Sequence, residues 1–95
     1  MARLGDSEID ERLASMQWRR DGESIVRDVE CKGFHSAMSL ANAVADAANE
    51  ANHHPDILIH GYKHVRLTLS THSAGGITDN DCALAKTIAG LIDTR

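Results

Sequence analysis

Three of the six histidines in this 95-residue chain stand at places where a fold can hold catalytic side chains. His53 and His54 separate a predicted helix from Pro55, and His72 follows the end of a predicted strand. Imidazole is suited to proton transfer near neutral pH because its unperturbed pKa is about 6.5. Several such rings around one cleft can supply an acid and a base together. The pattern therefore predicts an acid–base site if that helix and that strand are neighbours.

The same histidines allow two other interpretations. Each ring could be a solvated surface residue or a cap, although a His-His-Pro turn together with Thr-His before Gly-Gly favours a functional site. Three histidines could also bind a catalytic zinc ion, with Asp56 or Asp81 as a further ligand. Adjacent His53 and His54 lack the i, i+4 spacing of a helical metal pair, and neither cysteine lies near them. The expectation is therefore a site without a metal.

Polar residues beside the histidines have weaker signals. Ser70 and Thr71 point to opposite faces if they are strand neighbours, which favours polar contacts to a ligand over a nucleophilic triad. Asp81 is predicted at the third position of a helix capped by Thr78, where it can bond back to the cap and also orient a histidine. The remaining histidines are His35, His60 and His64, and no catalytic role is assigned to them. His60 and His64 are expected to face solvent or a subunit interface.

The N-terminal part of the chain predicts a helix and a hairpin. The helix spans residues 7–16 with Ser7 as its cap, and Trp18 is expected to pack where this helix meets a sheet. Asp21, Gly22 and Glu23 form a turn between two strands, residues 17–20 and 24–31. Alternation in the second strand is typical of a half-buried antiparallel strand and puts these residues on one face: Ile25, Arg27, Val29 and Cys31.

The rest of the chain repeats the order of helix and strands. A helix over residues 36–52, ended by Asn52, has a stripe of small apolar residues: Met38, Ala41, Val44, Ala45 and Ala48. Strands at residues 57–60 and 62–71 follow, with a bulge or bend at Gly61. The turn Gly75-Gly76 leads into a last helix with an apolar stripe of Leu84, Ile88, Leu91 and Ile92. This order, α-β-β-α-β-β-α, favours one α+β domain over residues 1–95, with three helices on one face of an antiparallel sheet.

Composition restricts the class of protein. The formal charge of −4 comes without a block of like charges, so the chain lacks the basic patch typical of nucleic-acid binding. No apolar run is typical of a signal peptide or approaches the ~18 residues of a membrane span. Cys31 and Cys82 are expected to be reduced thiols in a soluble, cytoplasmic protein. A core poor in aromatic residues is expected to be thin, so self-association would add stability.

With these residues in view, the chain from about Trp18 onward resembles the pterin-4a-carbinolamine dehydratases. The resemblance is carried by N-H-H-P-D at residues 52–56, Tyr62, V-R-L-T-L-S-T-H at 65–72, G-G-I-T at 75–78, Asp81, and F-H-S-A-M-S-L-A-N-A-V-A at 34–45. It implies a four-stranded antiparallel sheet with three helices on one face, assembled into homodimers or homotetramers. It also implies dehydration of 4a-hydroxytetrahydropterin, left by aromatic amino-acid hydroxylases, to quinonoid dihydropterin in pterin recycling, with no metal and no organic cofactor.

The resemblance also implies roles for single residues. The catalytic histidines would be His53, His54 and His72. The pterin pocket would be lined by residues 52–55 and 70–73, including Asn52, Pro55, Ser70, Thr71 and Ser73, with Asp81 in support. An acid delivers a proton to the leaving hydroxyl, and a base removes the proton from N5. We assign His54, together with His53, to the hydroxyl and His72 to the ring-nitrogen side.

The sequence departs from the family pattern at three places. The family's glutamate four residues before the first histidine is Asn49 here, and Glu50 stands one residue late. Six residues separate Pro55 from Tyr62, one more than in the animal pattern, which fits a bulge at Gly61. Aromatic positions of the family are occupied by smaller or more flexible side chains: Val29, Cys31 and Met38.

Two further functions stay open beside the dehydratase. Animal members of the family also bind a transcription factor, so a non-catalytic binding or coactivator module is one of them. The other is a pterin-related role in a different cofactor pathway, in an organism without a hydroxylase. The presence of His53, His54 and His72 favours the enzyme, since a scaffold needs none of these rings.

Overall fold

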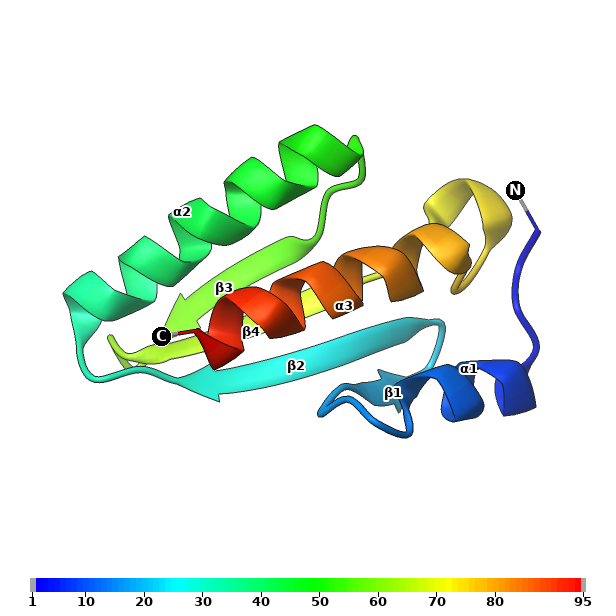
Figure 1. Cartoon of the computed structure of the whole chain (residues 1–95), viewed down its shortest axis with the longest axis horizontal. Coiled ribbons are helices and arrows are strands. Elements are labelled where there is room, and N and C mark those ends of the chain that lie inside the picture. Colours follow the sequence, from blue (N-terminus) through cyan, green and yellow to red (C-terminus); the bar gives the residue numbers. More distant parts are fainter. Residues whose placement is uncertain (1, 95) are drawn as a thin grey trace.

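The computed structural model describes residues 2–94, which form three α-helices, four strands and one short 3-10 helix (Figure 1). The elements in chain order are α1 (Asp6–Leu13), β1 (Arg19–Asp21), β2 (Ser24–Glu30), α2 (Phe34–Ala51), β3 (Asp56–His60), β4 (His64–Leu69), η1 (His72–Ala74) and α3 (Asp79–Asp93). The predicted order of helices and strands is confirmed. Among these helices, none combines the length and the apolar character needed to cross a membrane.

The strands form one antiparallel sheet in the order β1-β2-β4-β3. Ile25 of β2 pairs with Leu69 of β4, and Ile57 of β3 pairs with Leu67 of β4. Because side chains alternate along a strand, these four residues share one face of the sheet. Helices α2 and α3 lie side by side over this face, and α1 lies next to β1 (Figure 1). The predicted α+β architecture, with helices on one face, is confirmed.

The core between sheet and helices is built from aliphatic side chains and alanine. Val65, Leu67 and Leu69 of β4 are fully buried, and α2 faces them with its own buried stripe of Ala37, Leu40, Val44 and Ala48. The predicted stripe was wrong at Met38, which is 41% exposed. The helix is turned so that Leu40 and Val44 face the sheet, which places Met38 on the opposite side. The alanines keep the contact surface small, so α2 can lie close to the strands.

The N-terminal helix is shorter than predicted. It spans Asp6–Leu13 instead of residues 7–16, and its N-cap is Gly5, with no hydrogen bond from a capping side chain. Ser7 is therefore not the cap. A turn closed by the Met16 N–H and the Leu13 carbonyl ends the helix early and lets Trp18 enter the core at 5% exposure. This turn also delays the first strand, which is β1 and not residues 17–20.

The connection from β3 to β4 is a turn of residues 61–63, so the strand predicted from residue 62 begins later. Gly61 and Tyr62 both have positive φ, 54° and 55°, a conformation that costs little at glycine and more at tyrosine. His60 and His64 pair across this hairpin, and their rings stack with centroids 5.4 Å apart. His60 is exposed and His64 is half-buried.

The other face of the sheet carries a small charge network around Asp28. Arg19 donates a hydrogen bond to Asp28 from β1 (2.6 Å), and Arg66 donates one from β4 (2.7 Å). These bonds, the one from Arg66 first, hold the pKa of Asp28 below its ordinary value of 3.8. Since Asp28 is partly exposed, the stabilisation is that of a surface network.

Replacing Asp28 with asparagine is expected to lower the free energy of unfolding by about 0.5–1 kcal/mol at pH 7. A carboxyl whose pKa is lowered by folding stabilises fully above its unfolded pKa and loses this effect as the pH falls through the folded pKa. The difference between wild type and Asp28→Asn should therefore shrink as the pH falls below 3.8 in urea titrations. Asp46→Asn is the matched control, because exposed Asp46 forms no ion pair within residues 2–94; equal losses in both variants would contradict this account.

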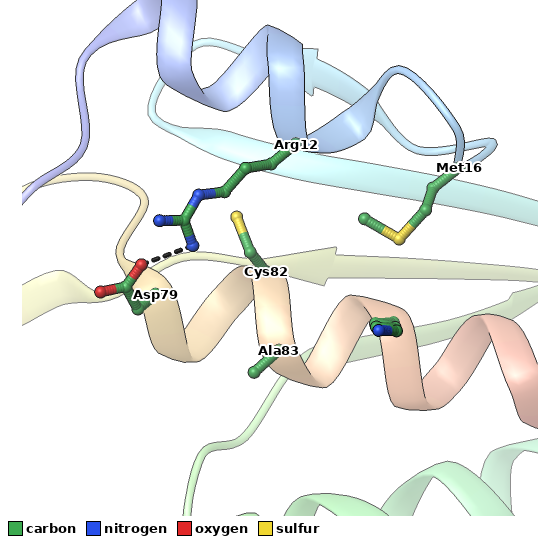
Figure 2. A pocket seen from close by; sticks show the side chains of 6 residues that line it. Arg12, Met16, Asp79, Cys82 and Ala83 are labelled. Atoms are coloured by element: carbon green, nitrogen blue, oxygen red, sulfur yellow. Dashed lines mark ion pairs between the residues drawn. The ribbon is translucent and has the colours of Figure 1, made fainter.

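A hollow of about 380 Å³ lies between α1 and α3, lined in part by Arg12, Met16, Asp79 and Cys82. Figure 2 shows the sulfur of Cys82 pointing from α3 toward α1, between Arg12 and Met16, and the ion pair of Arg12 with Asp79. Burial raises the pKa of the Cys82 thiol above its ordinary value. Cys82 is 6% exposed. Because its pKa lies above the ordinary value, the thiol stays protonated at neutral pH.

Cys82 is expected to resist alkylation in the folded protein, because the reactive thiolate is disfavoured and poorly accessible. With iodoacetamide at pH 8, half-buried Cys31 should be modified first, and Cys82 only when urea unfolds the chain. Peptide mass spectrometry at successive times measures both rates in one sample. Modification of Cys82 as fast as that of Cys31 in native buffer would refute the prediction.

Candidate active site

The end of α2 sets the direction of the two adjacent histidines. Helix α2 ends at Ala51, and Asn52 takes the left-handed conformation (φ 52°) that reverses the chain, as predicted for a helix-terminating asparagine. The His53 N–H donates to the Ala48 carbonyl at 3.1 Å, which completes the cap. Residues 53–55 then run without regular structure into β3. The two histidine rings therefore leave the chain at the junction of α2 and β3.

Asp81 lies at the start of α3 and is completely buried. It forms the predicted capping box with Thr78, whose N–H donates to Asp81 Oδ2 at 2.9 Å. The hydroxyl of Thr71, beyond the end of β4, donates to the same oxygen at 2.7 Å. The Thr71 and Thr78 hydroxyls are 2.9 Å apart and also within hydrogen-bond distance. One carboxylate oxygen thus joins the end of β4 to the beginning of α3.

The other oxygen of Asp81 binds His53. Nε2 of His53 lies 2.5 Å from Oδ1 of Asp81, and the histidine side chain is 13% exposed. A carboxylate only accepts hydrogen bonds, so Nε2 carries the proton in this arrangement and Nδ1 is the free ring nitrogen. The arrangement can fix the tautomer and the orientation of the His53 ring, as an aspartate does for a catalytic histidine.

His54 is held by a different kind of partner. Its Nε2 lies 3.1 Å from Oδ1 of Asn49, an amide oxygen one turn back in α2. An uncharged acceptor therefore stands where the resemblance leads one to expect a carboxylate. The side chain of Glu50, the other candidate for that role, forms no hydrogen bond or ion pair with another residue of the described chain.

His72 lies on a separate element. It is the first residue of η1, and both His72 and Ser73 are exposed. A bridge between Thr71 and Gly76 closes the loop that contains η1, with the Thr71 N–H donating to the Gly76 carbonyl at 2.9 Å. Ser70 donates its hydroxyl hydrogen bond away from this loop, to the Glu23 carbonyl in the β1–β2 turn (3.1 Å).

The predicted site residues are therefore joined only in part. Direct hydrogen bonds connect His53, Asp81 and Thr71, which bring the α2 end and the η1 loop together. Neither ring of His54 and His72 bonds to another predicted site residue within residues 2–94. No group of three or more His, Cys, Asp or Glu in this part of the chain is placed to hold a metal ion. Neither the hollow between α1 and α3 nor a second one beside Cys31 is lined by a histidine.

Two residues of the site were missed as site residues from the sequence. Thr78 was identified only as a helix cap, yet its backbone helps to hold the carboxylate that binds His53. The Thr-x-x-Asp capping signal, next to a Thr-His pair, could have indicated this shared use. Asn49 was noted only as a departure. Its contact with His54 depends on the direction that the His54 ring takes after the chain reversal at Asn52, and the sequence pattern does not determine this direction.

Comparison with known proteins identifies the family of this chain. Residues 2–91 match the family model described as pterin 4 alpha carbinolamine dehydratase. A protein of Thermomicrobium roseum is 49% identical over 96% of this chain and 98% of its own, and one of Acidobacterium capsulatum is 46% identical over 97% and 100%. The names of both relatives assign them provisionally as pterin-4-alpha-carbinolamine dehydratases.

Two solved structures share the fold. A transcriptional coactivator/pterin dehydratase from Brucella melitensis superposes with a TM-score of 0.88 and 31% identity, over 95% of this chain and 98% of that one. A pterin dehydratase-like protein identified as a RuBisCO assembly factor in the alpha-carboxysome has a TM-score of 0.68 over 82% and 92%. At 20% identity, the second likeness shows the fold alone. On the family model and the close relatives together, the chain belongs to the pterin 4 alpha carbinolamine dehydratase family.

Proposed function

We propose that this protein dehydrates 4a-hydroxytetrahydropterin to quinonoid dihydropterin and water, as a hydro-lyase acting in pterin recycling. The observation that carries the proposal is the buried Asp81 carboxylate, which holds His53 on one oxygen and Thr71, the neighbour of His72, on the other. The capping of α3 uses only Oδ2 of Asp81, so Oδ1 is left to orient His53. Family membership supplies the substrate class.

The reaction needs only two proton transfers. The C4a–O bond breaks as the hydroxyl leaves with an added proton, as water. The electron pair of N5 forms the C4a=N5 double bond, and the proton on N5 passes to a base. Each positioned acid or base typically contributes about 10²–10⁴-fold to the rate. Histidines on two sides of the pterin ring are sufficient, and we propose that neither a metal nor an organic cofactor takes part.

The roles follow the environments of the three rings. We assign His54, together with His53, to the side of the leaving hydroxyl, where the proton is delivered. The hydrogen bond to Asp81 fixes the orientation of the His53 ring, which suits a group that must deliver a proton at a set position. His72 is assigned to N5; it is exposed, and its ring forms no hydrogen bond with another described residue, so the ring is free to accept a proton.

The remaining predicted residues would line the substrate. Asn52 and Pro55 flank the two histidines, and Ser73 follows His72 in η1. Thr71 would act through its hydrogen bond to Asp81. The Ser70 hydroxyl would help to fix the loop through its hydrogen bond to the Glu23 carbonyl. We propose that the pterin lies between the junction of α2 with β3 and the η1 loop.

We also propose that the working form is a homodimer or homotetramer in the cytoplasm. The support is exposed apolar surface on two elements: Phe34 (57%) and Met38 (41%) on α2, and Ile57 (37%) and Leu58 (51%) on β3, a strand at one end of the sheet. An unpaired edge strand and apolar side chains on a helix are the surfaces that self-association covers.

Stopped-flow measurement with freshly generated 4a-hydroxytetrahydropterin tests the proposed reaction. The wild-type protein should accelerate dehydration over buffer, and exhaustive chelation should leave the rate unchanged. The double variant His54→Ala, His72→Ala should lose at least about a hundredfold in kcat/KM, since both proton transfers lose their groups. His35→Ala is the matched control, because His35 is exposed at the start of α2 and should retain the wild-type rate.

Absence of any acceleration by the wild-type protein would refute the enzyme and leave the non-catalytic binding module. A wild-type rate in the double variant would refute the site instead, while the reaction itself would stand.

Asp81→Asn is expected to lower kcat about a hundredfold or more. The amide N–H of the asparagine would face a group that now donates a hydrogen bond to the carboxylate. If the amide turns its oxygen to Thr71 and Thr78, its N–H faces His53 and favours the wrong ring tautomer. The ¹⁵N chemical shifts of the imidazole report this tautomer, which a loss of stability alone would not change. Asp79→Asn is the control, since Asp79 lies in the same helical turn but pairs with Arg12. An unchanged tautomer with a wild-type kcat would contradict the role of Asp81.

A further inference from the structure

The N-terminal segment crosses the loop that carries His72. The Leu4 N–H donates to the Ile77 carbonyl at 2.7 Å, directly before the cap of α3. Arg3 pairs with Glu23 of the β1–β2 turn at 2.9 Å. Figure 1 shows this segment, in dark blue, running past the yellow turn that leads into α3. Residues 3 and 4, named here the N-terminal strap, thus connect the loop to the β1–β2 turn.

Gly76 is the point where the strap meets the loop. A Cβ at this position would lie 2.8 Å from Nε of Arg3 and 2.8 Å from Oε2 of Glu23, closer than side chains can approach. Gly76 is buried, and the Arg3–Glu23 ion pair lies against its backbone. Any side chain here would displace the Arg3–Glu23 pair. Glycine therefore allows this pair to lie against the backbone of residue 76, and it does not serve an unusual φ angle.

The contacts of Glu23 and Gly76 lead directly to the proposed site. Gly76 forms the bridge with Thr71, and Thr71 donates to Asp81. The Glu23 carbonyl accepts the hydroxyl of Ser70, so the Glu23 residue contacts the loop on both sides of η1. His72 is exposed and lies between these two anchors. Its position is therefore set by contacts on the loop ends and not by bonds to its own ring.

From this geometry we infer that Arg3 and Glu23 are positioning residues, which restrain the His72 loop through Gly76; the inference rests on the proposed function. The Arg3 and Glu23 side chains are 52% and 59% exposed, and an ion pair so exposed contributes little to global stability. Its effect is local, on the opening of residues 70–77. Loss of the pair leaves the fold intact and lets His72 move relative to the pterin ring nitrogen.

The test compares Arg3→Ala with Arg19→Ala. Arg19 also pairs with one carboxylate, Asp28, at similar exposures (53% and 42%), but on the open face of the sheet away from the loop. Arg3→Ala should reduce kcat about two- to fivefold with little change in KM, because one exposed ion pair is lost and proton transfer is more sensitive to geometry than binding is. Arg19→Ala should keep the wild-type kcat. Arg3→Lys, which keeps the charge, should recover part of the loss.

A second measurement does not depend on activity. Hydrogen exchange by NMR reports the amides of Thr71, Ala74 and Gly75, whose bonds close the loop. Arg3→Ala should speed exchange at these amides about two- to fivefold and leave β4 unchanged. The charge reversal Arg3→Glu with Glu23→Arg should restore protection, and Gly76→Ala should remove it by displacing the pair.

The outcomes separate the two proposals. If the wild-type protein is inactive, the proposed function fails, and the exchange data alone decide whether the strap restrains the loop. If the wild-type protein is active and Arg3→Ala matches Arg19→Ala in kcat and exchange, the strap inference is overturned and the dehydratase stands. Faster loop exchange with an unchanged kcat would also overturn the positioning role.

Discussion

Asp81 is a charged group placed where no water reaches it, and the geometry around it is determined by that fact. A buried carboxylate is tolerated only when its oxygens accept enough hydrogen bonds to offset the lost hydration, which amounts to several kcal/mol. Its donors here come from three separate elements: the end of α2 through His53, the end of β4 through Thr71, and the first turn of α3 through Thr78. Satisfying one side chain therefore aligns the end of α2 with the end of β4 and the start of α3.

The division of work between the two oxygens explains why an aspartate can serve both as a cap and as a partner of histidine. Oδ2 accepts the Thr78 N–H, which would otherwise lack a partner at the helix start, and it also accepts the Thr71 hydroxyl. Oδ1 is left for His53. The position at a helix N-terminus adds a favourable field for the negative charge. Stability of α3 and orientation of His53 thus depend on the same residue.

Much of this arrangement was predictable because it is local. Alternation along β4, the chain reversal at Asn52 and the Thr78–Asp81 capping box each depend on residues a few positions apart, and all three are present. The errors lie where tertiary contact decides. Met38 fits an apolar stripe in the sequence but turns outward, since Leu40 and Val44 fill the space above the sheet. Ser7 looked like a cap, but Gly5 begins the helix, after Leu4 has bonded to Ile77.

The two adjacent histidines end in unlike environments, and this difference bears on the chemistry. His53 is mostly buried and its Nε2 faces the Asp81 carboxylate, which fixes the direction of the ring. His54 is exposed and faces the Asn49 amide, which orients the ring without adding a charge. The two rings are thus held by separate elements, His53 by the start of α3 and His54 by α2 itself. The junction of α2 with β3 therefore fixes both rings on the side that the proposal assigns to the leaving hydroxyl, and the single carboxylate of this network lies behind His53.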